Sequence, residues 1–148
     1  MRMTRVGSAR SWLAPAALAV ALPWLVGAAP QASPAAVTTL MQRDLADLPG
    51  KEALILTVDY LPGGASLPHR HDADVFVYVL TGAVVMQLAG GEPVTLHAGD
   101  TFYEGPQDIH VRSANPDPRV PAKLLVFMVK DLGRPVSRPA QAPRETAR

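Results

Sequence analysis

The sequence predicts a single all-β domain, either a sandwich or a barrel of short strands. Apolar residues recur at every second position from Leu54 to Tyr60, the period of a half-buried strand. Residues 75–80 read Val-Phe-Val-Tyr-Val-Leu, a run of β-branched and aromatic residues. Turn residues separate such segments at short intervals, and no helical period runs through them. The chain of 148 residues has room for one such domain.

The two ends of the chain are expected to lie outside this domain. Residues 1–28 are typical of an export signal, with arginines but no acid in the first ten residues, then an apolar stretch ending in small residues. Residues 29–37 form a short linker containing proline, and residues 134–148 are rich in proline and arginine, which predicts a disordered tail. The folded body is therefore expected at residues 38–133.

The apolar stretch at residues 12–28 has a second interpretation, a membrane anchor. It is at the short limit for spanning a bilayer and contains Pro15 and Pro23, so a cleaved signal is favoured. We therefore expect a secreted or periplasmic protein with no stable membrane span after cleavage.

The elements of the body follow in order. Thr39 to Gln42 fits a capping box, with Leu45 and Leu48 beyond, which predicts a short helix, although an extended strand suits these residues nearly as well. Gly82 and the pair Gly90-Gly91 then mark a break and a hairpin turn. The expected strands are residues 52–60, 75–80, 84–88, 94–96, 101–103, 109–112 and 124–129.

Composition excludes several classes of function. The formal net charge of +1 becomes about −2 once the three arginines of the export signal are removed, so no basic stripe remains for nucleic acid. The chain has no cysteine, which excludes disulfides, thiolate ligands and a nucleophilic thiol. Both tryptophans, Trp12 and Trp24, lie in the export signal, so no sugar-binding face can be built on indole rings.

Three histidines are the best indication of function. His69 and His71 follow a Pro-Gly-Gly turn, and His110 lies 39 residues after His71. Side chains at i and i+2 of a strand share one face, so His69 and His71 can both enter one cavity. Imidazole is the commonest protein ligand for late divalent metals, and a third nitrogen completes a site with open positions.

These histidines also carry a resemblance to a known family. Residues 63–82 read Gly-x5-His-x-His-x3-Val-x6-Gly, which resembles the first cupin motif. Residues 99–110 begin with Gly-Asp and end with Pro-x3-His, which resembles the second. The resemblance implies a double-stranded β-helix, a small jelly-roll barrel. It also implies one divalent metal ion (Fe, Zn, Ni, Cu or Mn) held by His69, His71 and His110.

One position departs from the family pattern. Cupins commonly carry a glutamate ligand where this chain has Val75, and valine cannot bind a metal. Asp74 and Glu104 are the acids that can compensate, although alternation places Asp74 on the opposite face and the direction of Glu104 is not fixed by the sequence. Three histidines alone are the simplest interpretation. Such a site keeps the full charge of the metal and favours a small anionic or chelating substrate.

Further candidates flank the second motif. Tyr103 and Glu104 are candidate catalytic groups, as hydrogen-bond partners of the ligands or as a general base, with core packing and a solvated loop as the alternatives. Arg112 follows His110 by two residues and is a candidate clamp for an anionic substrate, or else a partner in a salt bridge. Arg70 and His97 are expected to be surface residues.

Two functions remain open at this point. The first is a metal-dependent, dioxygenase-like enzyme, and the second is a non-catalytic module that binds a small molecule. Phe76, Tyr78, Leu80 and Met86 are out of phase with the cavity positions and predict an apolar outer face. That face suggests a homodimer, unless the segment from Val37 to Leu48 covers it.

Overall fold

The computed structural model describes residues 35–140 and confirms the all-β prediction. These residues form strands and turns and contain no helix, so none of them could span a bilayer as a helix. The strands are β1 (Ala36–Asp44), β2 (Lys51–Tyr60), β3 (Ala65–Ser66), β4 (His69–Arg70), β5 (Ala73–Thr81), β6 (Ala83–Leu88), β7 (Val94–His97), β8 (Thr101–Glu104), β9 (His110–Ala114), β10 (Ala122–Asp131) and β11 (Arg138–Pro139).

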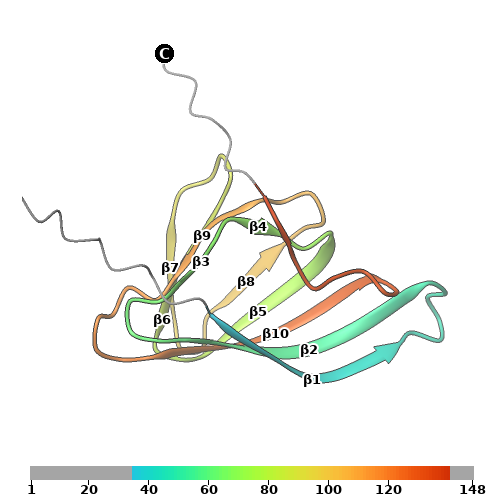
Figure 1. Cartoon of the computed structure of the whole chain (residues 1–148), viewed down its shortest axis with the longest axis horizontal. Helices are drawn as coiled ribbons and strands as arrows, with labels where there is room; N and C mark the ends of the chain where they lie inside the picture. The colour runs from blue at the N-terminus through green and yellow to red at the C-terminus, as the bar shows by residue number, and fades with distance from the viewer. Residues whose placement is uncertain (1–34, 141–148) are drawn as a thin grey trace, which may run out of the picture.

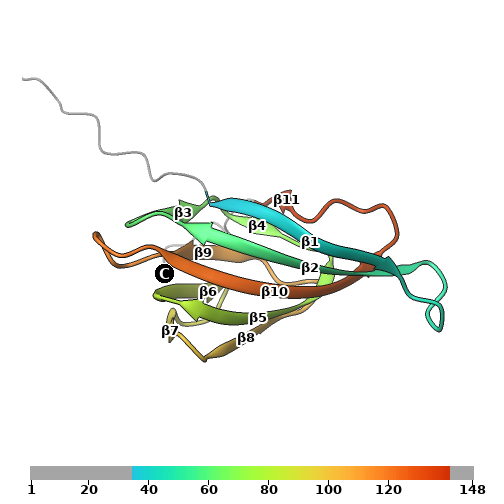
Figure 2. The same ribbon diagram turned by 90° about the horizontal axis from the view of Figure 1, so that it is seen from below.

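The strands build two antiparallel sheets that face each other (Figure 1). One sheet has the order β1-β2-β10-β5-β8, and its strands lie side by side in Figure 2. The other has the order β11-β4-β9-β6-β7, with β3 also paired to β9. Because consecutive strands alternate between the sheets at several points, the chain winds into a barrel with its interior between the two layers.

Alternation along the central strands fills the interior. On β5, Val75, Val77 and Val79 are buried, whereas Phe76 and Tyr78 point outward and are nearly half exposed. The neighbouring strand β10 buries its own alternate residues in the same way. Each buried aliphatic side chain of this kind stabilises the fold by about 1.5–3 kcal/mol.

The outer-face prediction is wrong for one residue. Met86 is 1% exposed and lies in the core, whereas Phe76, Tyr78 and Leu80 are exposed as expected. Met86 belongs to β6, which pairs with β9 in the opposite sheet. The alternation of β5 therefore does not continue through the turn at Gly82.

Gly82 is itself required by this turn between β5 and β6. Its φ is +73°, and a Cβ at this position would lie 2.7 Å from the carbonyl oxygen of Pro121. Both the backbone conformation and the close approach therefore exclude larger residues here.

The segment with the capping-box pattern is a strand and not a helix. Ala36–Asp44 pairs along β2, with a register shift between Thr39 and Met41. The ladder of β2 offers backbone partners that outweigh the local helical pattern. The strand also begins inside the expected linker, and it lies at the edge of its sheet with all nine residues exposed.

The tail prediction is wrong for the residues that the structure describes. Arg138 and Pro139 pair with Arg70 and His69 of β4, and the Arg138 guanidinium forms an ion pair with Asp72 at 2.6 Å. Backbone pairing and an ion pair hold a segment that has little to bury, which composition alone does not reveal. The export signal, most of the linker and residues 141–148 lie outside the described residues.

A buried ion pair joins β2 and β10 at one end of the first sheet. Glu52 and Lys130 are almost fully buried and paired, and Gln42 and the backbone N–H of Gly133 also donate to the Glu52 carboxylate. The hydrogen bond from Lys130 is the main reason that the pKa of Glu52 lies below its ordinary value.

Candidate metal centre

The structure brings the three predicted histidines together. His69 of β4 is the register partner of His110 on β9, and His71 lies just beyond β4. The ring of His69 lies 4.9 Å from that of His71 and 5.2 Å from that of His110, measured between centroids. One nitrogen from each ring lies within 4.8 Å of the others, which is close enough to share one ion.

Backbone carbonyls fix the orientation of two of these rings. Nδ1 of His69 lies 2.7 Å from the carbonyl oxygen of Leu67, and Nδ1 of His71 lies 2.7 Å from that of Val136. A carbonyl oxygen only accepts, so each Nδ1 carries the proton and each Nε2 keeps a free lone pair. Metal-binding histidines are commonly held in this way. Burial also lowers the pKa of His69, which keeps that ring neutral.

His110 provides the strongest indication of a missing partner. Its side chain is buried, and its Nε2 has no polar partner among the described residues, while Nδ1 has only the Glu104 carboxylate beside it, at 3.2 Å. Leaving a buried polar nitrogen unpaired costs about 1–3 kcal/mol. A metal ion coordinated by this nitrogen would remove that cost, so the residues present fit a metal.

Glu104 lies beside the histidines. It is 3% exposed, and its Oε2 lies 3.2 Å from Nδ1 of His110 and 3.7 Å from Nε2 of His71. On β8, it is the register partner of Val75 on β5. A carboxylate therefore enters the site from the strand next to the position where cupins commonly carry one. Burial raises the pKa of Glu104, but the facing His110, together with His71 and His69, more than offsets this and leaves the pKa below its ordinary value.

The prediction of a catalytic role for Tyr103 is not supported by its position. Tyr103 precedes Glu104 on β8, so alternation turns it outward, and half of it is exposed. Its hydroxyl donates to Asp74 at 2.7 Å, on the same outer surface. Asp74 therefore also points away from the histidines, and Glu104 is the acid that reaches them.

The predicted role of Arg112 as a substrate clamp is not supported by its position either. Arg112 is exposed and is not among the residues that line the cavity. Gln87 pairs with Arg112 and Leu88 pairs with His110, so Val111 is an extra residue that shifts the register. This bulge reverses the alternation, and Ser113 shares the cavity with His110 in place of Arg112.

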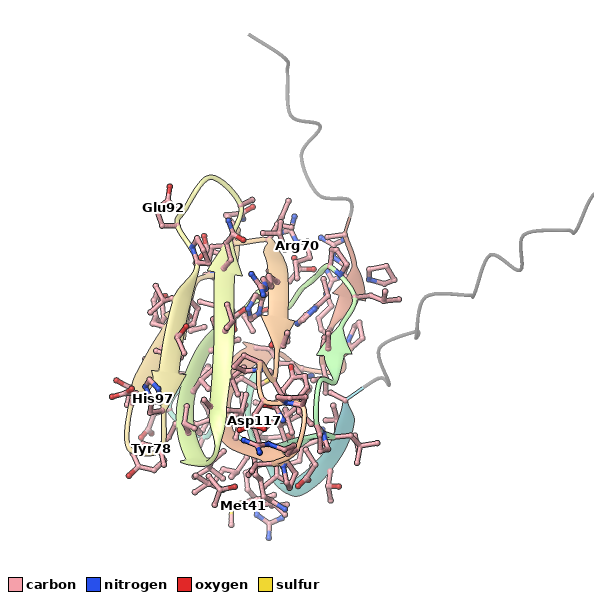
Figure 3. All side chains as sticks on the ribbon, turned by 90° about the vertical axis from the view of Figure 1, so that its left-hand side faces the viewer. Met41, Arg70, Tyr78, Glu92, His97 and Asp117 are labelled. Carbon is pink, nitrogen blue, oxygen red and sulfur yellow. The ribbon has the colours of Figure 1, made fainter. Side chains whose placement is uncertain are left out.

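Arg138 lines the cavity, and it shares one carboxylate, that of Asp72, with Arg70, so the three side chains keep a net charge of +1. Arg70 and Arg138 each form an ion pair with Asp72, at 2.6 Å, and Arg70 also donates to the carbonyl of Pro106. The Arg138 guanidinium is the main cause of a lowered pKa at Asp72. His97 is an exposed surface residue, as expected, and Figure 3 shows it at the periphery of the molecule.

The histidines lie in a cavity of about 350 Å³, a volume at the small end of ligand-binding sites. Its walls are mostly aliphatic side chains from both sheets, and residues 136–139 contribute to its lining. Besides the histidines and Glu104, the polar residues that line the cavity are Tyr60, Ser66, Ser113, Ser137 and Arg138. The alternation of apolar residues along β2 could have predicted that Tyr60 points into the barrel. Nothing in the sequence indicates that the carbonyl of Val136 reaches the site.

The comparison with known families agrees with this geometry. The family model described as "Cupin domain" matches residues 56–128. This barrel is a cupin domain. The histidines of the two cupin-like motifs thus lie within the matched region. In a separate comparison, no curated protein sequence matches the chain.

Solved structures with the same fold include several other proteins. A protein from Klebsiella pneumoniae with a double-stranded β-helix domain is 18% identical, with a TM-score of 0.58, over 76% of this chain and 90% of that one. A recombinant oxalate oxidase in complex with glycolate is 26% identical, with a TM-score of 0.51, over 64% of this chain and 50% of that one. The DMSP lyase DddQ from Ruegeria pomeroyi is 22% identical, with a TM-score of 0.54, over 63% of this chain and 45% of that one. This cupin thus spans half or less of the two enzymes.

Proposed function

We propose that this cupin binds one divalent metal ion through the Nε2 atoms of His69 and His71 and a ring nitrogen of His110, with Glu104 as a fourth ligand. The observation that carries the proposal is the convergence of three imidazoles, two of which are held by carbonyls so that a free lone pair remains. The unpartnered Nε2 of His110 supports it independently.

The proposed function of this site is to bind a small anionic or chelating molecule at the metal. A divalent ion with one carboxylate ligand keeps a net charge of about +1, smaller than that of a site with histidines alone. Arg138, which lines the cavity, is held in an ion pair with Asp72, although Asp72 also pairs with Arg70 and its one charge does not cancel both arginines. The net charge at the metal itself is matched best by one anionic group. The oxalate oxidase of similar fold is in complex with glycolate, a molecule of this kind.

Catalysis is proposed to depend on the metal. A bound divalent ion would supply Lewis acidity, and a redox-active ion would allow dioxygenase-like chemistry. Glu104 is the only carboxylate that lines the cavity within the described residues, so its use as a ligand leaves no separate carboxylate base there. That shortage is the observation that favours the second candidate, a non-catalytic module that captures the same class of molecule.

We further propose that the protein is exported and acquires its metal outside the cytoplasm. The arginines and the apolar stretch of residues 1–28 support this. Outside the cytoplasm the intrinsic order of affinities favours copper and zinc over ferrous iron, with nickel above iron and manganese below it. The N-terminal sequence of protein recovered from its native compartment tests the export. A mature N-terminus near residue 29 is expected, and an intact Met1 would contradict it.

Elemental analysis of purified protein tests the metal site, with two histidine variants as a matched pair. His71→Ala removes one proposed ligand. His97→Ala removes an exposed histidine that is not part of the histidine cluster. We expect close to one metal ion per chain in the wild type and in His97→Ala, and much less in His71→Ala. Equal, substoichiometric metal in all three would refute the metal site.

Turnover distinguishes the two candidate functions. An oxygen electrode with a panel of diketones, enols and phenols tests for dioxygenase-like activity in protein loaded with iron, copper or nickel. Substrate-dependent oxygen uptake that is lost in His71→Ala would favour the enzyme. Binding of panel members without turnover in any loaded form would favour the non-catalytic module.

A homodimer is proposed from the aromatic outer face of β5, β8 and β10. Phe76 lies 5.3 Å from Tyr103 and 6.0 Å from Phe127 between ring centroids, and all three are exposed together with Tyr78. Figure 3 shows Tyr78 projecting from the surface. An apolar patch of this kind is often an interface. Light scattering of the mature protein should give the mass of a dimer, and a clean monomer would contradict it.

A further inference from the structure

A cluster of three hydroxyls lies in the cavity apart from the histidines. Ser66 of β3 and Ser113 of β9 are register partners, and the hydroxyl of Tyr60 hydrogen-bonds to both, at 3.0 and 2.5 Å. Tyr60 and Ser113 are 3% and 4% exposed, and all three residues line the cavity. Nothing in the metal site described above uses this cluster.

Counting donors shows that the cluster has one hydroxyl proton to spare. The three hydroxyls carry three protons, and the two hydrogen bonds within the cluster use two of them. No other hydrogen bond of these side chains is present within residues 35–140. Whichever way the hydroxyls rotate, one O–H stays available, and a buried donor is costly to leave unpaired. Burial also raises the pKa of Tyr60, so its phenol stays protonated.

The position of the cluster relates it to the metal site. Ser113 follows His110 by three residues along β9, which places the two at most about 10 Å apart along the strand. The walls between the sheets are aliphatic, with Leu56, Val126 and Met128 among them. A single small molecule can therefore contact the metal site at one end and the hydroxyls at the other.

We propose that Tyr60, Ser66 and Ser113 form a second binding subsite, which holds a neutral hydrogen-bond acceptor on the end of the substrate remote from the metal. The inference rests on the proposed function for the other end of the molecule. It narrows the substrate to a small compound with one chelating or anionic group, a short apolar body and a carbonyl, ether or hydroxyl oxygen. A second charged group is disfavoured, because no unpaired cation lines this part of the cavity within the described residues.

Two hydroxamates that differ in one oxygen test the subsite in the metal-loaded protein. Heptanohydroxamic acid and 6-oxoheptanohydroxamic acid carry the same chelating head, and only the second has a distal carbonyl. Their dissociation constants are measured by calorimetry on the wild type, on the triple variant Tyr60→Phe/Ser66→Ala/Ser113→Ala and on the double variant Tyr60→Phe/Ser113→Ala, because each single substitution leaves a spare hydroxyl proton on the remaining members. Tyr78→Phe is the matched control, since it makes the same tyrosine-to-phenylalanine change on the exposed outer face.

We expect the oxo compound to gain roughly three- to tenfold in affinity over the plain one in the wild type, the usual effect of one added hydrogen bond. That ratio should fall close to one in the triple variant, which keeps no hydroxyl, fall part of the way in the double variant, which keeps only the partly exposed Ser66, and stay unchanged in Tyr78→Phe. Melting curves check that the variants are folded. If the first variant does not fold, the second still tests the subsite. An equal ratio in the wild type and both cavity variants would overturn the subsite.

A metal-free arm separates this inference from the metal proposal. Binding of heptan-2-one to chelator-treated protein is followed by ligand-observed NMR in the wild type and in the triple variant Tyr60→Phe/Ser66→Ala/Ser113→Ala. Weaker binding in the triple variant supports the subsite even if no metal is ever found. Equal binding, or no binding to either form, counts against it. Absence of stoichiometric metal, by contrast, refutes only the proposed function.

Discussion

Exchanging Val75 and Glu104 tests whether the carboxylate at position 104 on β8 takes the place of the glutamate that cupins commonly carry at the position of Val75 on β5. The two residues are register partners on β5 and β8, where paired Cα atoms lie about 4.5–5.5 Å apart. A glutamate side chain is long enough to span this distance. Both line the cavity. Glu104→Val should therefore remove the carboxylate from the metal, and adding Val75→Glu to it should return one.

The single and double variants are expected to differ in metal affinity and to agree in fold. Loss of a group that orients or binds the metal typically weakens affinity by about 10–100-fold, or about 1.4–2.7 kcal/mol. In the metal-free protein, Glu104→Val loses the contact with His110 but no longer buries a charge. These effects are each about 1–4 kcal/mol and opposite in sign, so stability should change little.

Competition titration against a metal chelator measures the affinity, and urea unfolding of the metal-free protein measures the stability. The expected order of affinity is the wild type, then the double variant, then Glu104→Val. Glu104→Gln serves as the isosteric control, since it removes the charge without changing the shape. Unchanged affinity in both single variants would refute Glu104 as a ligand. A double variant no tighter than Glu104→Val would refute the equivalence of the two positions.

Three further predictions concern the frame around the site. Ending the chain after Arg134 removes the carbonyl that holds His71 and should weaken metal binding about 10–100-fold in the same titration, whereas a chain ending at Ala140 should keep wild-type affinity. Gly82→Ala should destabilise the fold by about 2–4 kcal/mol in urea unfolding, through its positive φ and a backbone clash, and a smaller loss would contradict that reasoning. The lowered pKa of Glu52 means that its contribution to stability is complete above about pH 4.5 and is lost as the pH falls further. Urea unfolding between pH 3 and 7 should therefore show a flatter acid limb for Glu52→Gln, and parallel profiles would exclude this role.

The predictions that succeeded depended on local patterns. Alternating apolar residues identified β2 and β5, because the side chains of a strand face opposite sides whatever the rest of the chain does. The spacing of the two motifs likewise identified the three histidines. Where alternation broke, the predictions failed: the bulge at Val111 turned Arg112 outward, and the turn at Gly82 placed Met86 in the core.

By itself, the sequence determined the all-β class, the single domain and the histidines that converge, since each follows from periods and spacings within short segments. Only the tertiary structure decided that Glu104 reaches the site in place of a residue at position 75, because this depends on the pairing of β5 with β8. The same holds for the carbonyl of Val136 and for the hydroxyls of Tyr60 and Ser113. These contacts join residues 53 or more positions apart, and no local pattern encodes which distant strands become neighbours.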